Sequence, residues 1–215
     1  MDAVPDQNLP RVVVFDFGGV LLDWNPRYLY RKIFGEDEAG MEHFLTHVCS
    51  HTWNLMQDAG RTFDEGVAEL TERFPQYAEL IVAYHQRWEE TLSGAHEETV
   101  AVLRDLKAAG VPLYGITNYS AEKFAVTRAR FDFFGLFDGI VVSGEVKLVK
   151  PDPAIFLHFL DRYGLVAGDC VFIDDVAVNT AAASAVGFHA IHHRSAADLR
   201  RDLNDLGFLV PETVA

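Results

Sequence analysis

Cysteine is scarce in this sequence: only two occur among its 215 residues, Cys49 and Cys170. They lie far apart, without the spacing of metal ligands and without the number needed for a disulfide framework. Neither a disulfide scaffold nor a cysteine-based zinc site is therefore expected. The reducing environment of a cytoplasmic protein is the expectation that follows.

Long apolar segments are also lacking. No run approaches the roughly 18–20 apolar residues that are needed to span a bilayer. The N-terminal segment, MDAVPDQNLP, has neither the basic stretch nor the apolar run of a secretory signal peptide. We therefore expect a protein that is neither secreted nor embedded in a membrane.

Basic residues are few relative to acidic ones. The chain has 18 lysines and arginines against 32 aspartates and glutamates, which gives a formal net charge of −14. An acidic surface repels nucleic-acid backbones and anionic lipid, so neither nucleic acid nor a membrane is expected as a partner. An anionic small molecule would have to be captured by local positive groups. We expect a small-molecule partner, and a monomer or a homodimer.

What the sequence does contain is an alternation of strands and helices. Four β-branched or aromatic residues in a row, Val12 to Phe15, predict a strand buried on both faces, as in parallel sheets. After residue 94 the alternation resumes, which is typical of right-handed βαβ crossovers in a doubly wound sheet. Strands are predicted at 111–117, 139–143, 170–174 and 188–193, and helices at 96–109, 120–130, 153–163, 176–186 and 195–206.

The segment between the first strand and the rest has a different texture. From about residue 26 to 92, apolar residues recur at helical spacing and strand-like runs disappear. We predict an α/β fold, with a doubly wound, Rossmann-like parallel sheet core and an inserted α-helical cap domain. The core would comprise residues 1–25 and 93–215, and the cap domain residues 26–92.

Chemically active side chains follow the predicted strands. In an open parallel sheet, ligands bind beyond the carboxyl ends of the strands, so residues at these ends converge. Carboxylates from two strands form a hard oxygen site that suits Mg²⁺, which also accepts substrate phosphate as a ligand. The converging residues are Asp16, Thr117, Asn118, Lys150, Asp174 and Asp175.

The same set of residues can perform phosphoryl transfer. A carboxylate beside a metal ion can attack phosphorus in line and form an aspartyl-phosphate, which water then hydrolyses. A metal and a lysine neutralise the charge on the transferring oxygens. The Thr117 hydroxyl and the backbone N–H groups of the Phe17–Gly19 turn can bind the phosphoryl group. We therefore expect a small phosphorylated metabolite as substrate and Mg²⁺ as cofactor.

Four motifs, in this order, carry a resemblance to a known family. FDFGGVLLD, the strand that ends at Thr117-Asn118, KPDPAIF and FIDDVAVNTAAA together resemble the haloacid dehalogenase superfamily of hydrolases, in a phosphatase-like branch with a helical cap inserted after the first motif. The resemblance covers nearly all of residues 11–207. It implies Asp16 as nucleophile and metal ligand, Thr117 as the phosphate-binding hydroxyl, Lys150 as the motif lysine, Asp175 and Asp174 as the metal carboxylates, and the Gly18 carbonyl as a further metal ligand.

The first motif departs from the family's phosphatases at Gly18. There an aspartate usually protonates the leaving oxygen and later activates water. General acid–base catalysis is typically worth about 10²–10⁴-fold, so the loss of this group bears directly on efficiency. Asp23, at the exit of the first motif, is the candidate replacement, and Asp58 in the segment QDAGR is another.

Further substrate contacts are predicted around the first motif and in the cap. Gly19 and Asn118 adjoin the expected phosphoryl site, and Trp24 lies at the boundary between core and cap. Arg27 or Arg61 could hold a second anionic or hydroxylated part of the substrate. Both arginines would fit a solvated surface equally well, and Trp24 would fit a packed domain interface.

The chain has nine histidines, but their positions do not indicate a metal site. Those at positions 43, 47 and 51 have i, i+4 spacing, but no acidic partner lies in register with them. A zinc site is therefore not predicted.

Two other functions stay open. A 2-haloacid dehalogenase would use the same aspartate on carbon without a metal, and it too lacks the second aspartate. The Asp174-Asp175 pair favours Mg²⁺ and phosphate, because it would repel a carboxylate substrate unless a cation lay between them. A catalytically weak binding module fits the loss of the acid but not the retained nucleophile and lysine. A dinucleotide-binding oxidoreductase is excluded, since no G-x-G-x-x-G follows the first strand.

Overall fold

The computed structural model describes residues 10–209 of the chain. The expectation about the N-terminal segment falls almost entirely on residues 1–9, and the predicted core range ends with residues 210–215. Both stretches lie outside the described residues. Within residues 10–209, no helix is long and apolar enough to cross a membrane.

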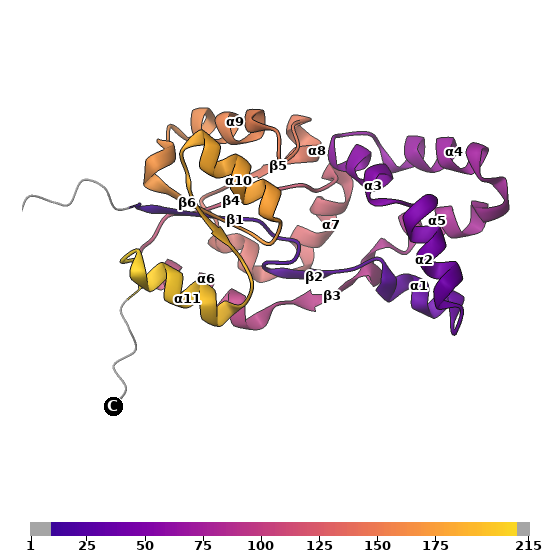
Figure 1. The fold of residues 1–215 in the computed structure, drawn as a ribbon, viewed down its shortest axis with the longest axis horizontal. Helices are drawn as coiled ribbons and strands as arrows, with labels where there is room; N and C mark the ends of the chain where they lie inside the picture. The colour runs from indigo at the N-terminus through magenta and orange to yellow at the C-terminus, as the bar shows by residue number, and fades with distance from the viewer. Residues whose placement is uncertain (1–9, 210–215) are drawn as a thin grey trace, which may run out of the picture.

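A five-stranded parallel sheet forms the centre of the protein (Figure 1). Its strands lie in the order β5-β4-β1-β6-β7, so the chain starts in the middle and winds outward in both directions. The predicted α/β fold with a doubly wound parallel sheet is confirmed. The strands are β1 (Val12–Phe15), β4 (Leu113–Thr117), β5 (Gly139–Val142), β6 (Cys170–Asp174) and β7 (His189–His192).

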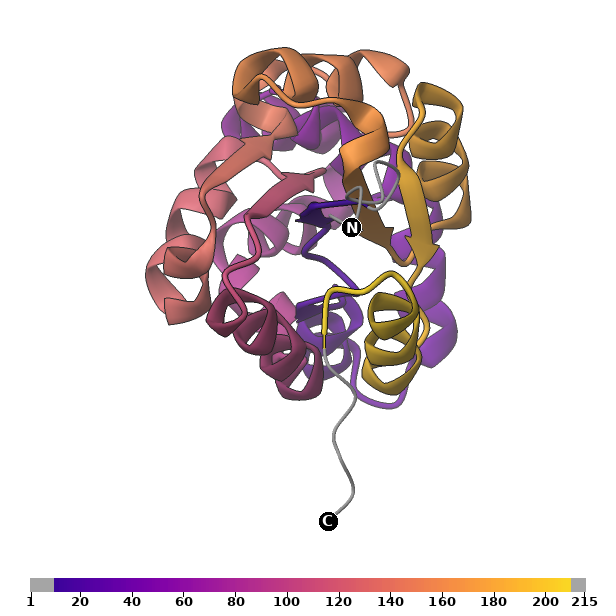
Figure 2. The same cartoon turned by 90° about the vertical axis from the view of Figure 1, so that its left-hand side faces the viewer.

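The alternating side chains of β1 pack into two separate cores. Val13 and Phe15 join one apolar cluster, and Val12 and Val14 join another on the opposite face of the sheet. This double burial explains the uninterrupted apolar run in the sequence. Figure 2 shows the helices that cover each face. The first face carries α6 (Glu97–Ala108), α7 (Ala121–Arg130) and α11 (Ala196–Asp205), and the second α9 (Pro153–Tyr163) and α10 (Ala177–Val186).

Local sequence signals set the ends of these helices. Asp152 accepts a hydrogen bond from the backbone N–H of Ala154, and Pro153 occupies the first turn of α9, where its missing N–H costs nothing. Ser195 caps α11 as expected, by accepting from the N–H of Asp198. The predicted strand at 139–143 ends one residue early, because Ser143 starts a short helix, α8 (Ser143–Val146).

Residues 27–91 form a group of helices beyond the carboxyl ends of the sheet strands, which we call the helical insertion (Figure 1). It follows β2 (Leu22–Trp24) and precedes β3 (Leu92–Ala95), which pair antiparallel. This pair was not predicted, since strands of three and four residues give no readable alternation. The insertion contains α1 (Arg27–Phe34), α2 (Glu38–His47), α3 (His51–Asp58), α4 (Phe63–Arg73) and α5 (Ala78–Gln86), with 3₁₀ turns at Pro75–Tyr77 and Trp88–Thr91.

Candidate active site

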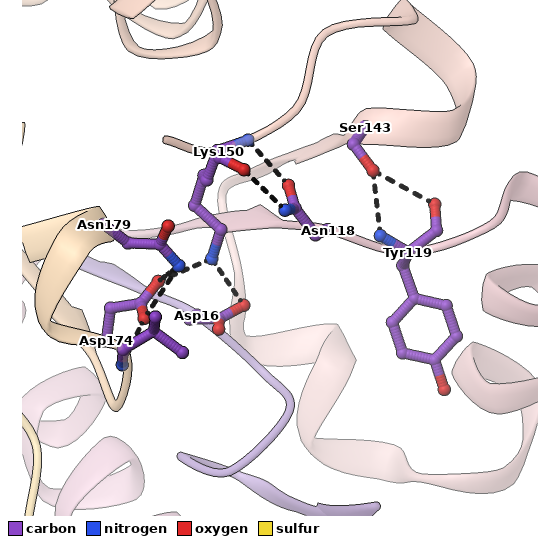
Figure 3. A network of polar contacts seen from close by, with 8 residues as sticks. Asp16, Asn118, Tyr119, Ser143, Lys150, Asp174 and Asn179 are labelled. Carbon is purple, nitrogen blue, oxygen red and sulfur yellow. Dashed lines mark hydrogen bonds and ion pairs between the residues drawn. The ribbon is translucent and has the colours of Figure 1, made fainter. Parts of the chain in front are cut away.

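Lys150 lies between two carboxylates at the centre of the sheet edge (Figure 3). Its Nζ is 2.9 Å from Oδ1 of Asp16, at the end of β1, and 2.6 Å from Oδ2 of Asp174, at the end of β6. All three side chains are buried. The predicted convergence of strand ends thus brings the first and fourth motifs together with the motif lysine.

The charges of these side chains do not cancel, because carboxylates outnumber the single ammonium. Burial raises the pKa of Asp16 to about 7, against the lowering effect of Lys150, and the nearby Asp174 raises it further. The pKa of Lys150 is raised as well, because the attraction of Asp16 and Asp174 outweighs the effect of burial. With Asp175 included, three carboxylates face a single ammonium. An excess of buried negative charge requires either protons or a cation.

The two aspartates that end β6 have different surroundings. Asp174 is fully buried and accepts hydrogen bonds from Lys150, from the Asn179 side chain and from the backbone N–H of Val176 (Figure 3). Asp175 is exposed. No other side chain among the described residues donates a hydrogen bond to its carboxylate. Asp174 therefore holds the site together, and Asp175 is free to bind a ligand.

The carboxylates fit a divalent cation. Asp16, Asp174 and Asp175 each offer an oxygen, and these oxygens lie within 4.8 Å of one another. Hard oxygen ligands with only one neighbouring ammonium are the donor set that Mg²⁺ prefers. No other group of three or more His, Cys, Asp or Glu side chains within residues 10–209 has this arrangement.

Asn118 positions the loop that carries Lys150. Its side-chain amide accepts from the backbone N–H of Lys150 at 2.8 Å and donates to the carbonyl of the same residue at 2.9 Å. Asn118 was predicted to bind substrate. It does line the cavity described below, but its polar atoms are already bonded to Lys150, so its clearest role is to orient the lysine. Thr117 is buried at the end of β4 and does not line this cavity.

The turn after Asp16 brings two glycines to the site. A Cβ at Gly18 would meet no heavy atom within 4 Å, whereas Gly19 has φ 72° and a Cβ there would collide with the Asp175 carboxylate. Gly19 donates its N–H to the carbonyl of Leu22. Contrary to the expectation from the sequence, this N–H is therefore not free to bind a phosphoryl oxygen. The N–H of Gly18 donates to no group among the described residues.

A cavity of about 410 Å³ lies between the sheet edge and the helical insertion. The core contributes Asp16, Gly18, Lys150 and Asp175 to its wall. The insertion contributes one face of α3, whose members recur at positions i, i+3, i+4 and i+7. These are His51, Asn54, Leu55 and Asp58.

Asp58 is the one carboxylate that the insertion places on the cavity wall. It is buried and accepts a 3.0 Å hydrogen bond from the amide of Asn54, which in turn accepts from the hydroxyl of Tyr84 at 3.1 Å. Burial raises the pKa of Asp58 to about 7, and the charge of Asp16 adds to this rise. Sequence reasoning named Asp58 second to Asp23, and missed Asn54 and Leu55.

The structure places Asp23 and Arg27 away from this wall. Asp23 does not line the cavity, and its carboxylate accepts from the Tyr28 hydroxyl at 2.8 and 2.9 Å. Arg27 pairs with Glu42 through two bonds and lines a separate surface hollow. Neither position supports the role predicted for it, because local partners on α1 and α2 hold both side chains. Trp24 lines the cavity, and its role in substrate binding stays a prediction.

Comparison with known proteins identifies the family. A family model described as haloacid dehalogenase-like hydrolase matches residues 10–187. The chain belongs to the haloacid dehalogenase-like hydrolases. The resemblance carried by the four motifs is thereby confirmed, and the chain is an enzyme of the hydrolase class.

Two proteins that are similar in sequence to this chain are named as phosphatases. A sesquiterpene phosphatase from Aspergillus oryzae is 29% identical over 182 residues, which cover 85% of this chain and 89% of the relative. A phosphorylated carbohydrates phosphatase from Thermotoga maritima is 24% identical over 185 residues, which cover 84% of this chain and 83% of the relative. Phosphatases thus occur among the sequence relatives of this hydrolase.

Solved structures share the fold. A HAD family enzyme from Bacteroides thetaiotaomicron, in complex with magnesium and inorganic phosphate, has a TM-score of 0.65 at 21% identity and covers 86% of this chain and 94% of its own. An L-2-haloacid dehalogenase has a TM-score of 0.66 at 20% identity, with coverages of 91% and 99%. The fold of this chain is therefore shared by an enzyme that was crystallised with magnesium and phosphate and by a dehalogenase.

Proposed function

We propose that this hydrolase is a Mg²⁺-dependent phosphomonoester hydrolase that acts on a small phosphorylated metabolite through an aspartyl-phosphate on Asp16. The observation that carries the proposal is the cluster of Asp16, Asp174 and Asp175 around a single buried lysine. Such a cluster favours a divalent cation and a phosphate ligand. The names of the two phosphatase relatives support the same activity.

In the first step, the carboxylate of Asp16 attacks phosphorus, and the bond between phosphorus and the ester oxygen breaks. Lys150 contacts Oδ1 of Asp16 and so fixes the orientation of the nucleophile. Mg²⁺, held by Asp16, Asp174 and Asp175, would neutralise charge on the phosphoryl oxygens. The Gly18 N–H, which has no partner among the described residues, can donate to one of these oxygens.

The departing alcohol oxygen requires a proton, which Asp58 is placed to donate. Its carboxyl group lines the cavity opposite the core residues and has a pKa raised to about 7 by burial, so much of it is protonated at neutral pH. In the second step, the ionised Asp58 accepts a proton from the water that attacks the aspartyl-phosphate. Inorganic phosphate leaves and Asp16 is regenerated. Asp58 would thus replace the aspartate that the family's phosphatases carry at the position of Gly18.

The catalytic groups of the proposed mechanism are divided between the helical insertion and the rest of the chain. We propose residues 26–92 as a cap domain that supplies the acid, and residues 1–25 and 93–215 as the core that supplies the nucleophile and the metal ligands. The sequence predicts the Thr117 hydroxyl as a phosphate ligand, and that role stays a proposal for a side chain that is buried at the end of β4.

A 2-haloacid dehalogenase is the second candidate, because such an enzyme has the same fold. Its substrate would bring a carboxylate into a cavity that already holds Asp16, Asp58 and Asp175 beside one lysine. Like charges in a poorly solvated site repel strongly unless a cation lies between them, and a dehalogenase uses no metal, which favours the Mg²⁺-dependent phosphatase. A binding module without activity is disfavoured by the intact contacts between Lys150 and its two carboxylates.

The proposal is tested with the purified protein and phenyl phosphate, with Mg²⁺ and with EDTA, alongside 2-chloropropionate. We expect hydrolysis of the ester with Mg²⁺, none in EDTA, and no release of chloride. Chloride release that persists in EDTA would assign the dehalogenase activity instead.

A further inference from the structure

Beside the polar side chains of His51, Asn54 and Asp58, the cavity wall has a large apolar part. Trp24, Trp88 and Tyr119 form a continuous aromatic surface, with ring centroids 5.8 Å apart for the first pair and 6.1 Å for the second. Leu55 of α3 adds an aliphatic side chain. A substrate whose phosphate reaches Asp16 must place its organic part against this surface.

Two valines extend the apolar surface to the mouth of the cavity. Val176 and Val178 lie one and three residues after Asp175, and they are 43% and 60% exposed. Exposed valines are common singly, but these two line a cavity whose wall is already aromatic. Contact with an apolar group would remove them from water, which is favourable in proportion to the area buried.

Positive charge is almost absent from the same wall. Lys150 is the only lysine or arginine on it within the described residues, and its ammonium is bound to Asp16 and Asp174. His51, exposed at the start of α3, is the only other lining side chain that can become cationic.

The two arginines that were predicted to hold a second anionic or hydroxylated part of the substrate are engaged elsewhere. Arg27 pairs with Glu42, and Arg61 donates to Glu69 at 2.6 Å and to Gln57 at 2.7 Å. Neither lines the cavity. A phosphorylated acid or a densely hydroxylated sugar would therefore lose hydration without gaining matching partners.

We propose that the substrates are monophosphates of apolar alcohols, in which an aryl or alkyl group rests on Trp24, Leu55, Trp88, Tyr119 and the two valines. This inference rests on the proposed phosphatase activity and adds the chemical class of the substrate. A volume of about 410 Å³ is in the range of small-molecule sites, so the organic part is of modest size.

The test compares kcat/KM for methyl, butyl and octyl phosphate, glucose 6-phosphate, phosphoglycolate and phenyl phosphate, all with Mg²⁺. The n-alkyl esters have similar leaving groups, so differences among them report contact with the apolar surface. We expect kcat/KM to rise by up to about fourfold for each methylene buried. Octyl phosphate should exceed glucose 6-phosphate at least tenfold, and phosphoglycolate should be the poorest substrate.

A matched pair of variants locates the effect. Val178→Ser makes the cavity mouth polar, whereas Val166→Ser makes the same change at a valine that is 67% exposed and lies outside the cavity. The ratio of octyl to methyl phosphate kcat/KM should fall severalfold in Val178→Ser and stay at the wild-type value in Val166→Ser. Leu55→Arg should raise kcat/KM for phosphoglycolate.

The outcomes separate this inference from the proposed function. Hydrolysis of all the esters without dependence on chain length, or a preference for phosphoglycolate or glucose 6-phosphate, would overturn the substrate class and leave the phosphatase intact. Hydrolysis of none of them, phenyl phosphate included, would overturn the phosphatase itself and this inference with it.

Discussion

The side-chain amide of Asn54 donates a 3.0 Å hydrogen bond to the carboxylate of Asp58. Both residues lie on the face of α3 that borders the cavity, and both are buried. The bond holds the carboxyl group in the wall of the cavity that Asp16 also lines. A residue from the helical insertion can in this way complete a site whose other parts come from the sheet.

Asp58→Asn should lower kcat/KM for alkyl phosphates by about 10²–10⁴-fold, which is the usual contribution of a general acid. Aryl phosphates should lose far less, because an aryloxide of low pKa departs without a proton. Rates across a series of leaving-group pKa values measure this difference. Asp23→Asn is the matched control and should leave the series unchanged. A selective loss with alkyl esters in Asp23→Asn instead would return the acid role to Asp23.

The pH profile offers a second check on Asp58. Burial raises the pKa of this carboxyl group to about 7, so it is protonated below that pH and loses its proton as the pH rises through it. The value of kcat/KM for an alkyl phosphate should therefore fall above pH 7 in the wild type. This limb should be missing in Asp58→Asn, while any limb due to ionisation of the substrate remains. An identical basic limb in both proteins would exclude Asp58 as its source.

The two glycines after Asp16 should respond differently to a side chain. Gly18→Asp restores the family's usual acid at a position where a Cβ meets no heavy atom within 4 Å, so we expect a stable protein. Because Asp58 already serves as the acid, kcat/KM for alkyl phosphates should rise about tenfold or more only when Asp58→Asn is present as well. Gly19→Ala forces a residue with φ 72° and a Cβ into collision with Asp175, so it should weaken Mg²⁺ binding. A tenfold gain from Gly18→Asp alone would show that Asp58 does not supply the acid.

The aspartates at the end of β6 should separate stability from metal binding. Asp175→Ala removes an exposed carboxylate and should weaken Mg²⁺ binding at least tenfold, with little change in the free energy of unfolding. Asp174→Ala leaves Lys150 with one buried partner and should destabilise the fold by about 3–5 kcal/mol. Calorimetric titration with Mg²⁺ and urea denaturation measure the two effects. Weaker Mg²⁺ binding in Asp174→Ala than in Asp175→Ala would reverse their assignment.

The sheet and its edge were predictable because the residues of each strand show by themselves that it is a buried strand. The run from Val12 to Phe15 specifies a doubly buried strand, and a parallel sheet then brings Asp16 and Asp174 to the same edge. Lys150 follows from its motif and contacts both. These predictions need only the order of the strands in the sheet. That order is largely determined by the rule that connections between parallel strands are short and right-handed.

The wall supplied by α3 could not be predicted in the same way. The spacing of His51, Asn54, Leu55 and Asp58 places them on one helical face, but nothing local shows that this face meets the sheet edge. That relation depends on how the helical insertion packs. Asp23 illustrates the converse, since its nearness in sequence to Asp16 suggested a role, whereas its side chain is held by Tyr28.

In the proposed mechanism, Asp16 becomes phosphorylated during turnover. Rapid acid quench of the wild-type protein with excess phenyl phosphate and Mg²⁺, followed by mass spectrometry of the peptide that contains Asp16, measures this directly. We expect a phosphoryl group on Asp16 in the wild type and none in Asp16→Asn, which should fold normally and be inactive. Turnover with no phosphorylated peptide, or an Asp16→Asn protein that keeps most of its activity, would contradict this mechanism.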